Sequence, residues 1–456
     1  METRTIAAIS TPMGIGGIAV IRLSGDRAIE IADKAFMGKD KLCEVDTHTV
    51  HYGHIIDENS KKIDEVLVTV MKAPRSYTCE DVVEISTHGG VVSSKGVLKR
   101  LIELGAYHAE AGEFTKRAFL NGRIDLSQAE AVIDIINSKT IMERDNALSQ
   151  SEGSLSERIN DIRQELLNLA ASMQVIIDYP DEELEDVTCE DIRIRANDAK
   201  KGIQTLIMTS ENGKIIREGI KTAIVGKPNV GKSSLLNFLA KEERAIVTDI
   251  AGTTRDVIEE CVNVDGVMLV LADTAGIRET DDVVEKIGVS KSLKSIENSD
   301  FVIVMLDSST KPDDEEIKLI DKTRDKKRIV IINKTDIGDS SVIEEIKKMI
   351  DSEPIEISIK TGEGTQKVIE EIKKLYNFGE LYQSDGVIVT NMRHISALTN
   401  AKEALDRVEE SIECGMPSDI ASIDLNLAIE ALGEITGAVV SDDIVSAVFH
   451  DFCVGK

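Results

Sequence analysis

The segment Gly226–Ser233 constrains the fold of this chain more than any other. It reads Gly-Lys-Pro-Asn-Val-Gly-Lys-Ser, a full match to G-x-x-x-x-G-K-S, and it joins a strand-like run, Lys221–Val225, to a helix-like run, Ser234–Ala240. In such a loop, backbone N–H groups surround phosphates, Lys232 supplies positive charge, and the Ser233 hydroxyl can ligate Mg²⁺. The pattern predicts a phosphate-binding loop in an α/β domain.

Four further motifs follow in the order that a GTPase requires, and the first two serve the metal ion and the γ-phosphate. Gly252–Asp256 offers the Thr254 hydroxyl to Mg²⁺. Asp273–Gly276 follows a strand-like run and supplies a carboxylate near the metal and a glycine N–H for the γ-phosphate. In a GTPase, the two segments that carry these motifs contact Mg²⁺ and the γ-phosphate, and they therefore distinguish GTP from GDP.

The last two motifs read the base. Asn333–Asp336 follows the strand-like run Ile329–Ile332, and the Asp336 carboxylate can accept hydrogen bonds from N1–H and the 2-amino group of guanine. Adenine lacks this pair of donors. Ser358–Lys360 completes the pocket. Five ordered matches on alternating strands and helices predict a doubly wound, Ras-like G domain over residues 220–376.

The residue that follows the motif Asp273–Gly276 does not show how the attacking water is oriented during GTP hydrolysis. Ras-like switches orient water with a Gln there and neutralise phosphoryl charge with an arginine finger, whereas this chain has Ile277. Nearby carboxylates could orient water, and spacing does not choose among them. They are Glu279, Asp281, Asp282 and Glu285.

A second cation at the phosphates could replace the finger. Asn229 has a side-chain carbonyl suited to a monovalent cation, and the segment Thr248–Ile250 could fold over it. The alternative is that Asn229 only satisfies backbone groups of its own loop. The residues alone leave both readings open.

The segments on either side of the G domain are acidic and helical. The chain has 82 Asp and Glu against 54 Lys and Arg, a net charge of −28, and most of the excess acid lies in residues 124–219 and 377–456. Apolar residues recur there at helical spacing. Because a helix with one apolar stripe must bury it, we expect one helical domain made of 121–219 and 377–456, with the G domain inserted in it.

Residues 1–120 differ from the rest. Short β-rich runs alternate with glycine-containing turns, which predicts a small α+β domain. Six scattered cysteines without a Cys-x-x-Cys pair, and the absence of a targeting or long apolar stretch, indicate a cytoplasmic protein with no membrane association. The net charge argues against a broad basic surface for nucleic acid.

Further motifs make the chain similar to one known family. They are Thr11-Pro12, Gly16-Gly17, Ser76–Thr78, Glu80–Glu84, His88–Gly90, Gly112–Asn121 and Phe452–Lys456. Together with the GTPase motifs, they make nearly the whole chain resemble the MnmE, or TrmE, family of tRNA modification GTPases. One departure is Arg123, where some members have Lys.

The resemblance implies a fold, partners and a function. It implies an N-terminal dimerisation and tetrahydrofolate-binding domain, a helical domain and an inserted G domain, in a homodimer whose G domains pair in the GTP state. It implies that the protein works with the flavoprotein MnmG, which holds FAD. The pair would add a carboxymethylaminomethyl-type group to the 5-carbon of the wobble uridine of tRNA, using a one-carbon unit of a 5-formyl or 5,10-methylene tetrahydrofolate.

The resemblance also implies site residues. The folate contacts fall on Arg22, Glu84, Arg123 and Lys456. The K⁺ ligands fall on Asn229, Thr248, Ile250 and Thr253, and the water-orienting carboxylate falls on Glu285. Motifs and resemblance together give the contacts of GTP, Mg²⁺ and K⁺ as Asn229, Val230, Gly231, Lys232, Ser233, Ser234, Thr248, Asp249, Ile250, Ala251, Gly252, Thr253, Thr254, Asp273, Thr274, Ala275, Gly276, Asn333, Lys334, Asp336, Ser358 and Lys360.

Cys453 lies in the C-terminal motif. The resemblance implies that this thiol is needed for tRNA modification, which suggests a nucleophilic or redox role. The alternative is a buried, small hydrophobic side chain.

A rival function is a ribosome-assembly GTPase that acts as a switch without chemistry on RNA. Such a protein would be expected to carry a basic RNA-binding domain, yet residues 377–456 hold 14 acids and 4 bases. A folate-dependent aminomethyltransferase is a second rival, and it leaves the GTPase motifs unexplained.

Overall fold

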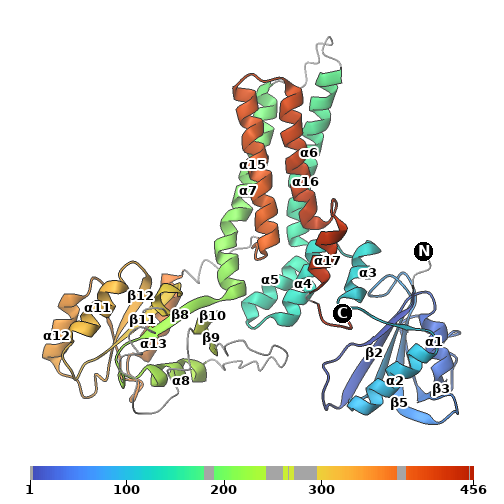
Figure 1. Cartoon of the computed structure of the whole chain (residues 1–456), viewed down its shortest axis with the longest axis horizontal. Helices are drawn as coiled ribbons and strands as arrows, with labels where there is room; N and C mark the ends of the chain where they lie inside the picture. Colours follow the sequence, from blue (N-terminus) through green and yellow to red (C-terminus); the bar gives the residue numbers. More distant parts are fainter. Residues whose placement is uncertain are drawn as a thin grey trace. The chain divides into compact units, whose positions relative to one another are not determined.

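The computed structural model describes residues 4–178, 189–242, 260–264, 266–271, 295–376, 387–450 and 452–456 (Figure 1). The chain forms two compact units. The first comprises Met1–Ile133, Gln150–Ala199 and Asn400–Lys456, and the second comprises Asp134–Ser149 and Lys200–Thr399. The second unit therefore takes in more of the chain than the expected G domain, whose boundaries stay a prediction.

A seven-stranded sheet forms the amino-terminal part of the first unit, with strand order β3-β4-β5-β6-β2-β1-β7. Neighbouring strands are antiparallel except for β1 and β7, which are parallel. The strands are β1 (Ile6–Ile9), β2 (Ile18–Ser24), β3 (Phe36–Gly38), β4 (Thr49–Ile56), β5 (Lys62–Met71), β6 (Val82–His88) and β7 (Tyr107–His108). The expected α+β fold is confirmed.

One face of this sheet is covered by helices. Val66, Val68 and Val70 alternate along β5 and are buried in a core shared with α1 (Ala28–Ala35) and α2 (Val91–Glu103). Side chains alternate between the faces of a strand, so the intervening residues lie on the other face. That face carries the residues expected to bind folate.

Helices complete the first unit. The residues Leu155, Ile159, Ile162, Leu166, Leu169 and Met173, expected to form a buried stripe, are all buried. They belong to α6 (Ser154–Asp178), which lies against α16 (Ser418–Thr436) (Figure 1). The shorter helices of this unit are α3 (Glu113–Leu120), most of α4 (Leu126–Asn137) and α17 (Asp442–His450), whereas α5 (Ile141–Ser151) lies almost wholly in the second unit. Two long helices, α7 (Cys189–Glu218) and α15 (Met392–Glu413), have residues in both units.

The C-terminal tail returns to the start of α3. Ala111 and Val454 form an isolated antiparallel β-bridge, and the backbone N–H of Phe114 donates to the carbonyl oxygen of Lys456 at 3.2 Å. These contacts place the tail against the sheet domain, more than 300 residues away in sequence.

A glycine allows the tail to approach the sheet. Gly455 has φ +97°, and a Cβ there would lie 2.5 Å from the carbonyl oxygen of Ile9. The Ser10 hydroxyl donates to the carbonyl oxygen of Gly455 at 2.9 Å. A larger residue would clash and would also be strained at this φ, so the tail can dock only with glycine here.

The second unit contains a six-stranded sheet in the order β13-β12-β11-β8-β10-β9. All neighbours are parallel except β9 and β10. The strands are β8 (Ile220–Val225), β9 (Glu260–Val264), β10 (Val267–Leu271), β11 (Phe301–Asp307), β12 (Lys327–Asn333) and β13 (Ile355–Glu356), and the helices are α8 (Lys232–Glu242), α11 (Asp314–Lys322), α12 (Ser340–Met349) and α13 (Thr365–Leu375).

Both faces of this sheet are covered, as expected for a doubly wound fold. Ile303 and Met305 of β11 share a core with α8 and α13, whereas Val302 and Val304 share a second core with α11 and α12. The fold class expected from the sequence is therefore confirmed. Across both units, none of the helices in the described ranges has the length and apolar character needed to span a lipid bilayer.

Candidate functional site

The phosphate-binding loop follows β8 and ends in α8. A Cβ at Gly226 would lie 2.3 Å from the carbonyl oxygen of Met305, and Asn229 has φ +64°. The Lys232 ammonium donates to the carbonyl oxygens of Gly226 and Lys227, both at 2.7 Å, and burial lowers its pKa. The loop thus encloses its own lysine. Because an ammonium has three donors, these two carbonyl contacts leave one donor for a phosphate.

The side chain of Asn333 connects this loop to the base-reading loops. Its amide nitrogen donates to the carbonyl oxygen of Val230 at 2.8 Å, and its amide oxygen accepts from the N–H of Ile359 at 3.2 Å. The Ser358 hydroxyl donates to the Asp336 carboxylate at 2.8 Å. Three motifs that are distant in sequence therefore meet at the carboxyl ends of parallel strands, where such folds bind ligands.

The remaining described residues that were expected to contact GTP lie close to the same strand ends. Lys334 has φ +65° and its ammonium lies 2.6 Å from the Asp307 carboxylate. Ser233 and Ser234 lie in the first turn of α8, which begins at Lys232. The helix was expected to begin at Ser234. It begins earlier because the N–H of Leu235 already donates to the carbonyl oxygen of Gly231. Lys360 follows β13 and is exposed.

Part of the expected site lies outside the described residues. These positions are Thr248, Asp249, Ile250, Ala251, Gly252, Thr253, Thr254, Asp273, Thr274, Ala275, Gly276 and Glu285. Their assignment to metal ions, the γ-phosphate and water stays a prediction.

The expected folate residues gather on the face of the first unit's sheet that lies opposite α1 and α2. Arg22 of β2 and Glu84 of β6 face each other across the ladder, and the Arg22 Nη2 lies 2.7 Å from the Glu84 carboxylate. Burial lowers the pKa of Lys456, and the nearby positive charge of Arg22 lowers it further. A carboxylate and two cations at one place suit a ligand with both donor and acid groups.

Tyr77 lies at the centre of this group, a role that the sequence motifs did not reveal. The guanidinium carbon of Arg22 lies 5.2 Å from the ring centroid, and that of Arg123 lies 4.8 Å from it. The Tyr77 hydroxyl is hydrogen-bonded to Thr115 at 2.9 Å, and its carbonyl oxygen accepts from Arg123. The ring therefore separates two of the four expected folate contacts.

Comparison with known proteins decides the family. A family model described as MnmE helical domain matches residues 126–453, and one described as GTP-binding protein TrmE N-terminus matches residues 5–123. The tRNA modification GTPase MnmE of Lactobacillus acidophilus is 49% identical over 100% of this chain and 99% of that protein. The MnmE of Streptococcus thermophilus is 50% identical over the same shares. This chain belongs to the MnmE family.

A more distant similarity concerns part of the chain. A crystal structure of Era in complex with MgGDPNP and a 16S ribosomal RNA segment is 32% identical, covering 41% of this chain and 66% of that chain, with a TM-score of 0.27. Membership of the MnmE family makes this protein a tRNA modification GTPase. The phosphate-binding loop and the base-reading loops lie together, as binding of a single nucleotide requires.

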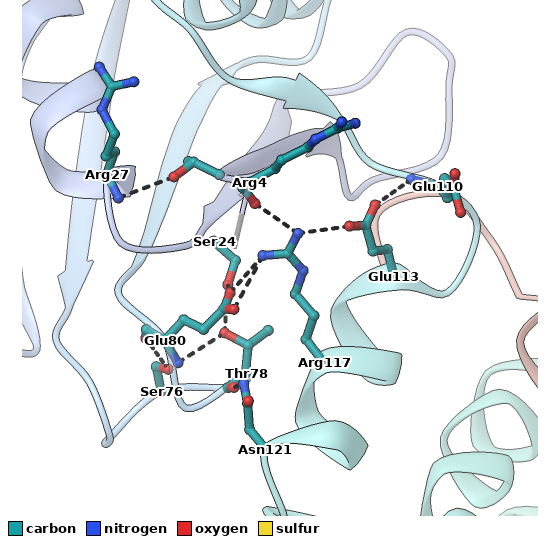
Figure 2. A network of polar contacts seen from close by, with 11 residues as sticks. Arg4, Ser24, Arg27, Ser76, Thr78, Glu80, Glu110, Glu113, Arg117 and Asn121 are labelled. Atoms are coloured by element: carbon teal, nitrogen blue, oxygen red, sulfur yellow. Dashed lines mark hydrogen bonds and ion pairs between the residues drawn. The ribbon is translucent and has the colours of Figure 1, made fainter. Parts of the chain in front are cut away.

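Buried charges hold the MnmE-type sheet domain to α3. The Arg117 guanidinium donates to the Glu80 carboxylate at 3.0 and 3.2 Å, to the Glu113 carboxylate at 2.8 Å and to the carbonyl oxygen of Arg4. Figure 2 shows Arg117 reaching from α3 into this group, where Glu80 and Ser24 lie beside its guanidinium. The Ser24 hydroxyl donates to Glu80 at 2.7 Å.

This network fixes the loop that carries Tyr77. The Asn121 side-chain amide donates to the carbonyl oxygen of Thr78, and the Ser76 hydroxyl donates to the carbonyl oxygen of Glu80 (Figure 2). Residues on both sides of Tyr77 are therefore tied to fixed neighbours. The Tyr77 ring is held between Arg22 and Arg123 by contacts between distant segments, which a short sequence motif does not predict.

Cys453 precedes the tail residues that dock on the sheet. Its carbonyl oxygen accepts from the N–H of Gly112, and the residue is a free, exposed cysteine. The alternative that Cys453 is a buried hydrophobic side chain is therefore wrong. An exposed thiol beside a fixed backbone is available to a reagent, and its chemical role stays a prediction.

Proposed function

We propose that this GTPase uses Mg²⁺ and K⁺ and acts as a homodimer, joined through its amino-terminal domain, with an MnmG-type flavoprotein. Together they add a carboxymethylaminomethyl-type group to the 5-carbon of the wobble uridine of tRNA. The one-carbon unit comes from a 5-formyl or 5,10-methylene tetrahydrofolate bound on the face of the sheet opposite α1 and α2. Family membership supports the proposal, as does the meeting of Arg22, Glu84, Arg123 and Lys456.

An unsatisfied donor carries the folate part of the proposal. Arg22 uses Nε and Nη2 on Glu84, but its Nη1 is buried and has no hydrogen-bond partner. A buried donor without a partner is costly, and a ligand that accepts a hydrogen bond there would remove that cost. A folate offers carbonyl and carboxylate oxygens that suit it, so the residues present fit the group.

The chain's own residues bind and orient this ligand. Glu84 accepts hydrogen bonds from ring N–H groups, Arg22 donates from Nη1, and Arg123 and Lys456 attract the acid tail. When bound, the tetrahydrofolate supplies the one-carbon unit. Lys456 reaches the site only because the tail docks on the sheet.

The nucleotide part assigns roles within the second unit. Lys232 neutralises the β- and γ-phosphates, Ser233 and Thr254 ligate Mg²⁺, and Asp336 selects guanine. Asn229, with Thr248, Ile250 and Thr253, holds K⁺ at the position of the absent arginine finger, and Glu285 orients water. Asn229 has a left-handed backbone, with φ +64°, and is exposed.

GTP turnover is expected to rise several-fold when potassium replaces sodium at equal ionic strength. A fixed cation stabilises the charge that develops on the phosphoryl group, and a cation of different size fits the same ligands poorly. Steady-state phosphate release measured in the two chlorides tests this. Substitution of Asn229 by alanine should remove the difference, and equal rates in both salts for the unsubstituted protein would contradict the K⁺ assignment.

Deleting the gene in its host is expected to abolish the wobble-uridine modification seen by mass spectrometry of total tRNA. Unsubstituted protein supplied from a plasmid should restore the modification. Glu84→Gln should fail to restore it, since the amide cannot accept both ring donors and cannot pair fully with Arg22. Glu103→Gln, which alters an exposed carboxylate of the same unit, is the matched control. Unchanged tRNA in the deletion strain would leave the ribosome-assembly switch as the better reading.

A further inference from the structure

Lys227, the second residue of the phosphate loop, makes contacts that no role assigned above requires. Its ammonium lies 2.7 Å from the Asp313 carboxylate and 2.9 Å from the Glu316 carboxylate. The Glu316 side chain is only 3% exposed, whereas that of Asp313 is about half exposed. A loop residue thus reaches a buried acid on another element.

The two acids belong to the start of α11. Asp313 is the N-cap, and its carboxylate accepts from the N–H groups of Glu315 and Glu316. The Glu316 carboxylate accepts in turn from the N–H of Asp313, which completes a capping box. Lys227 therefore binds carboxylates that α11 already holds in place. Burial lowers the pKa of Lys227, but the hydrogen bonds to Asp313 and Glu316 outweigh that effect and raise it.

The backbone of Lys227 is engaged at the same time. Its carbonyl oxygen accepts from the Lys232 ammonium at 2.7 Å. One residue therefore links the cap of α11, through its side chain, to the phosphate-binding lysine, through its carbonyl. Movement of its side chain would move the loop that must surround the phosphates.

We propose that Lys227 is a positioning residue for nucleotide binding, which ties the phosphate loop to the cap of α11 and neutralises two carboxylates beside the loop. Its ligand class is the polyphosphate of a guanine nucleotide, which it affects without needing to touch it. Removal of the ammonium leaves the Glu316 charge buried and uncompensated. That negative charge disfavours an incoming polyphosphate.

Lys227→Met in the full-length chain is expected to raise KM for GTP by about tenfold and to change kcat by less than about twofold. The dissociation rate of a fluorescent GDP analogue should rise in parallel. Lys227→Arg should keep KM within about threefold of the unsubstituted value, because a guanidinium can also bridge two carboxylates. Thermal unfolding of each variant, followed in parallel, separates a loss of fold from a loss of position.

The double variant Lys227→Met, Glu316→Gln tests the charge itself. If the uncompensated carboxylate is the cause, this variant should recover most of the lost affinity, and the two substitutions should be non-additive. Lys347→Met is the matched control, because Lys347 forms a 2.7 Å ion pair with Glu356 in the same unit; its KM should be unchanged. An unchanged KM in Lys227→Met, or a double variant no better than Lys227→Met, would overturn the proposal.

Discussion

Arg117→Met is expected to lower the free energy of opening of the first unit's sheet by about 3–5 kcal/mol. The substitution removes the cation from Glu80, whose side chain is 9% exposed and whose carboxylate would stay buried without a charge partner. The contacts of Arg117 with Glu113 and with the carbonyl oxygen of Arg4 are lost as well. Hydrogen exchange of the β2 and β6 amides, measured by mass spectrometry, reports this opening.

A matched variant separates this effect from the loss of any surface charge. Lys99 forms a 3.7 Å ion pair with Glu103 on α2, and its side chain is 79% exposed. Lys99→Met should change the same exchange rates by no more than about 1 kcal/mol. Similar exchange in the Arg117 and Lys99 variants would show that the network in Figure 2 does not hold the sheet domain to α3.

Asp336→Asn is expected to weaken GTP binding by about a hundredfold to a thousandfold. The carboxylate would accept two hydrogen bonds from guanine, and hydrogen bonds to a charged group contribute about 1.5–3 kcal/mol each. The amide accepts only at its oxygen and places a donor opposite the 2-amino group. Equilibrium titration with a fluorescent GTP analogue measures the loss.

A changed base should rescue this variant. Xanthine has a carbonyl oxygen where guanine has its 2-amino group, so the Asn amide donates where the carboxylate accepted, and xanthosine triphosphate should bind the variant better than GTP does. Asp339→Asn is the control: Asp339 caps α12 through the N–H of Ser341, and an Asn cap is equally good. An unaltered affinity of the Asp336→Asn variant for GTP would show that Asp336 does not contact the base.

The parts of the fold that repeat a local pattern could be predicted from the sequence. The apolar alternation of β5 and the stripe of α6 each specify one element with one buried face, and the apolar run Ile329–Ile332 specifies the buried strand β12. The structure confirms all three. The phosphate and base loops were equally predictable, because each motif places its functional atoms within a few residues of one strand.

Contacts between distant segments could not be predicted in this way. The ring of Tyr77 between Arg22 and Arg123 depends on the pairing of β2 with β6 and on the position of α3. The ion pair of Lys227 with Glu316 depends on how α11 packs against one face of the second unit's sheet. A single sequence carries no signal for either pair, since the spacing between the partners is set by the whole fold.

The docking of the tail sets the order in which the residues of the proposed folate site come together during protein synthesis. Ser10 and Gly455, which meet in the folded protein, are separated by 445 residues. At about 5–20 residues per second on the ribosome, Ser10 is made roughly 20–90 s before Gly455. The sheet can therefore fold early with Arg22 and Glu84 in place, but Lys456 joins them only after the helices and the G domain have been made. In a newly made chain, all residues of the second unit are therefore present before the proposed folate site is complete.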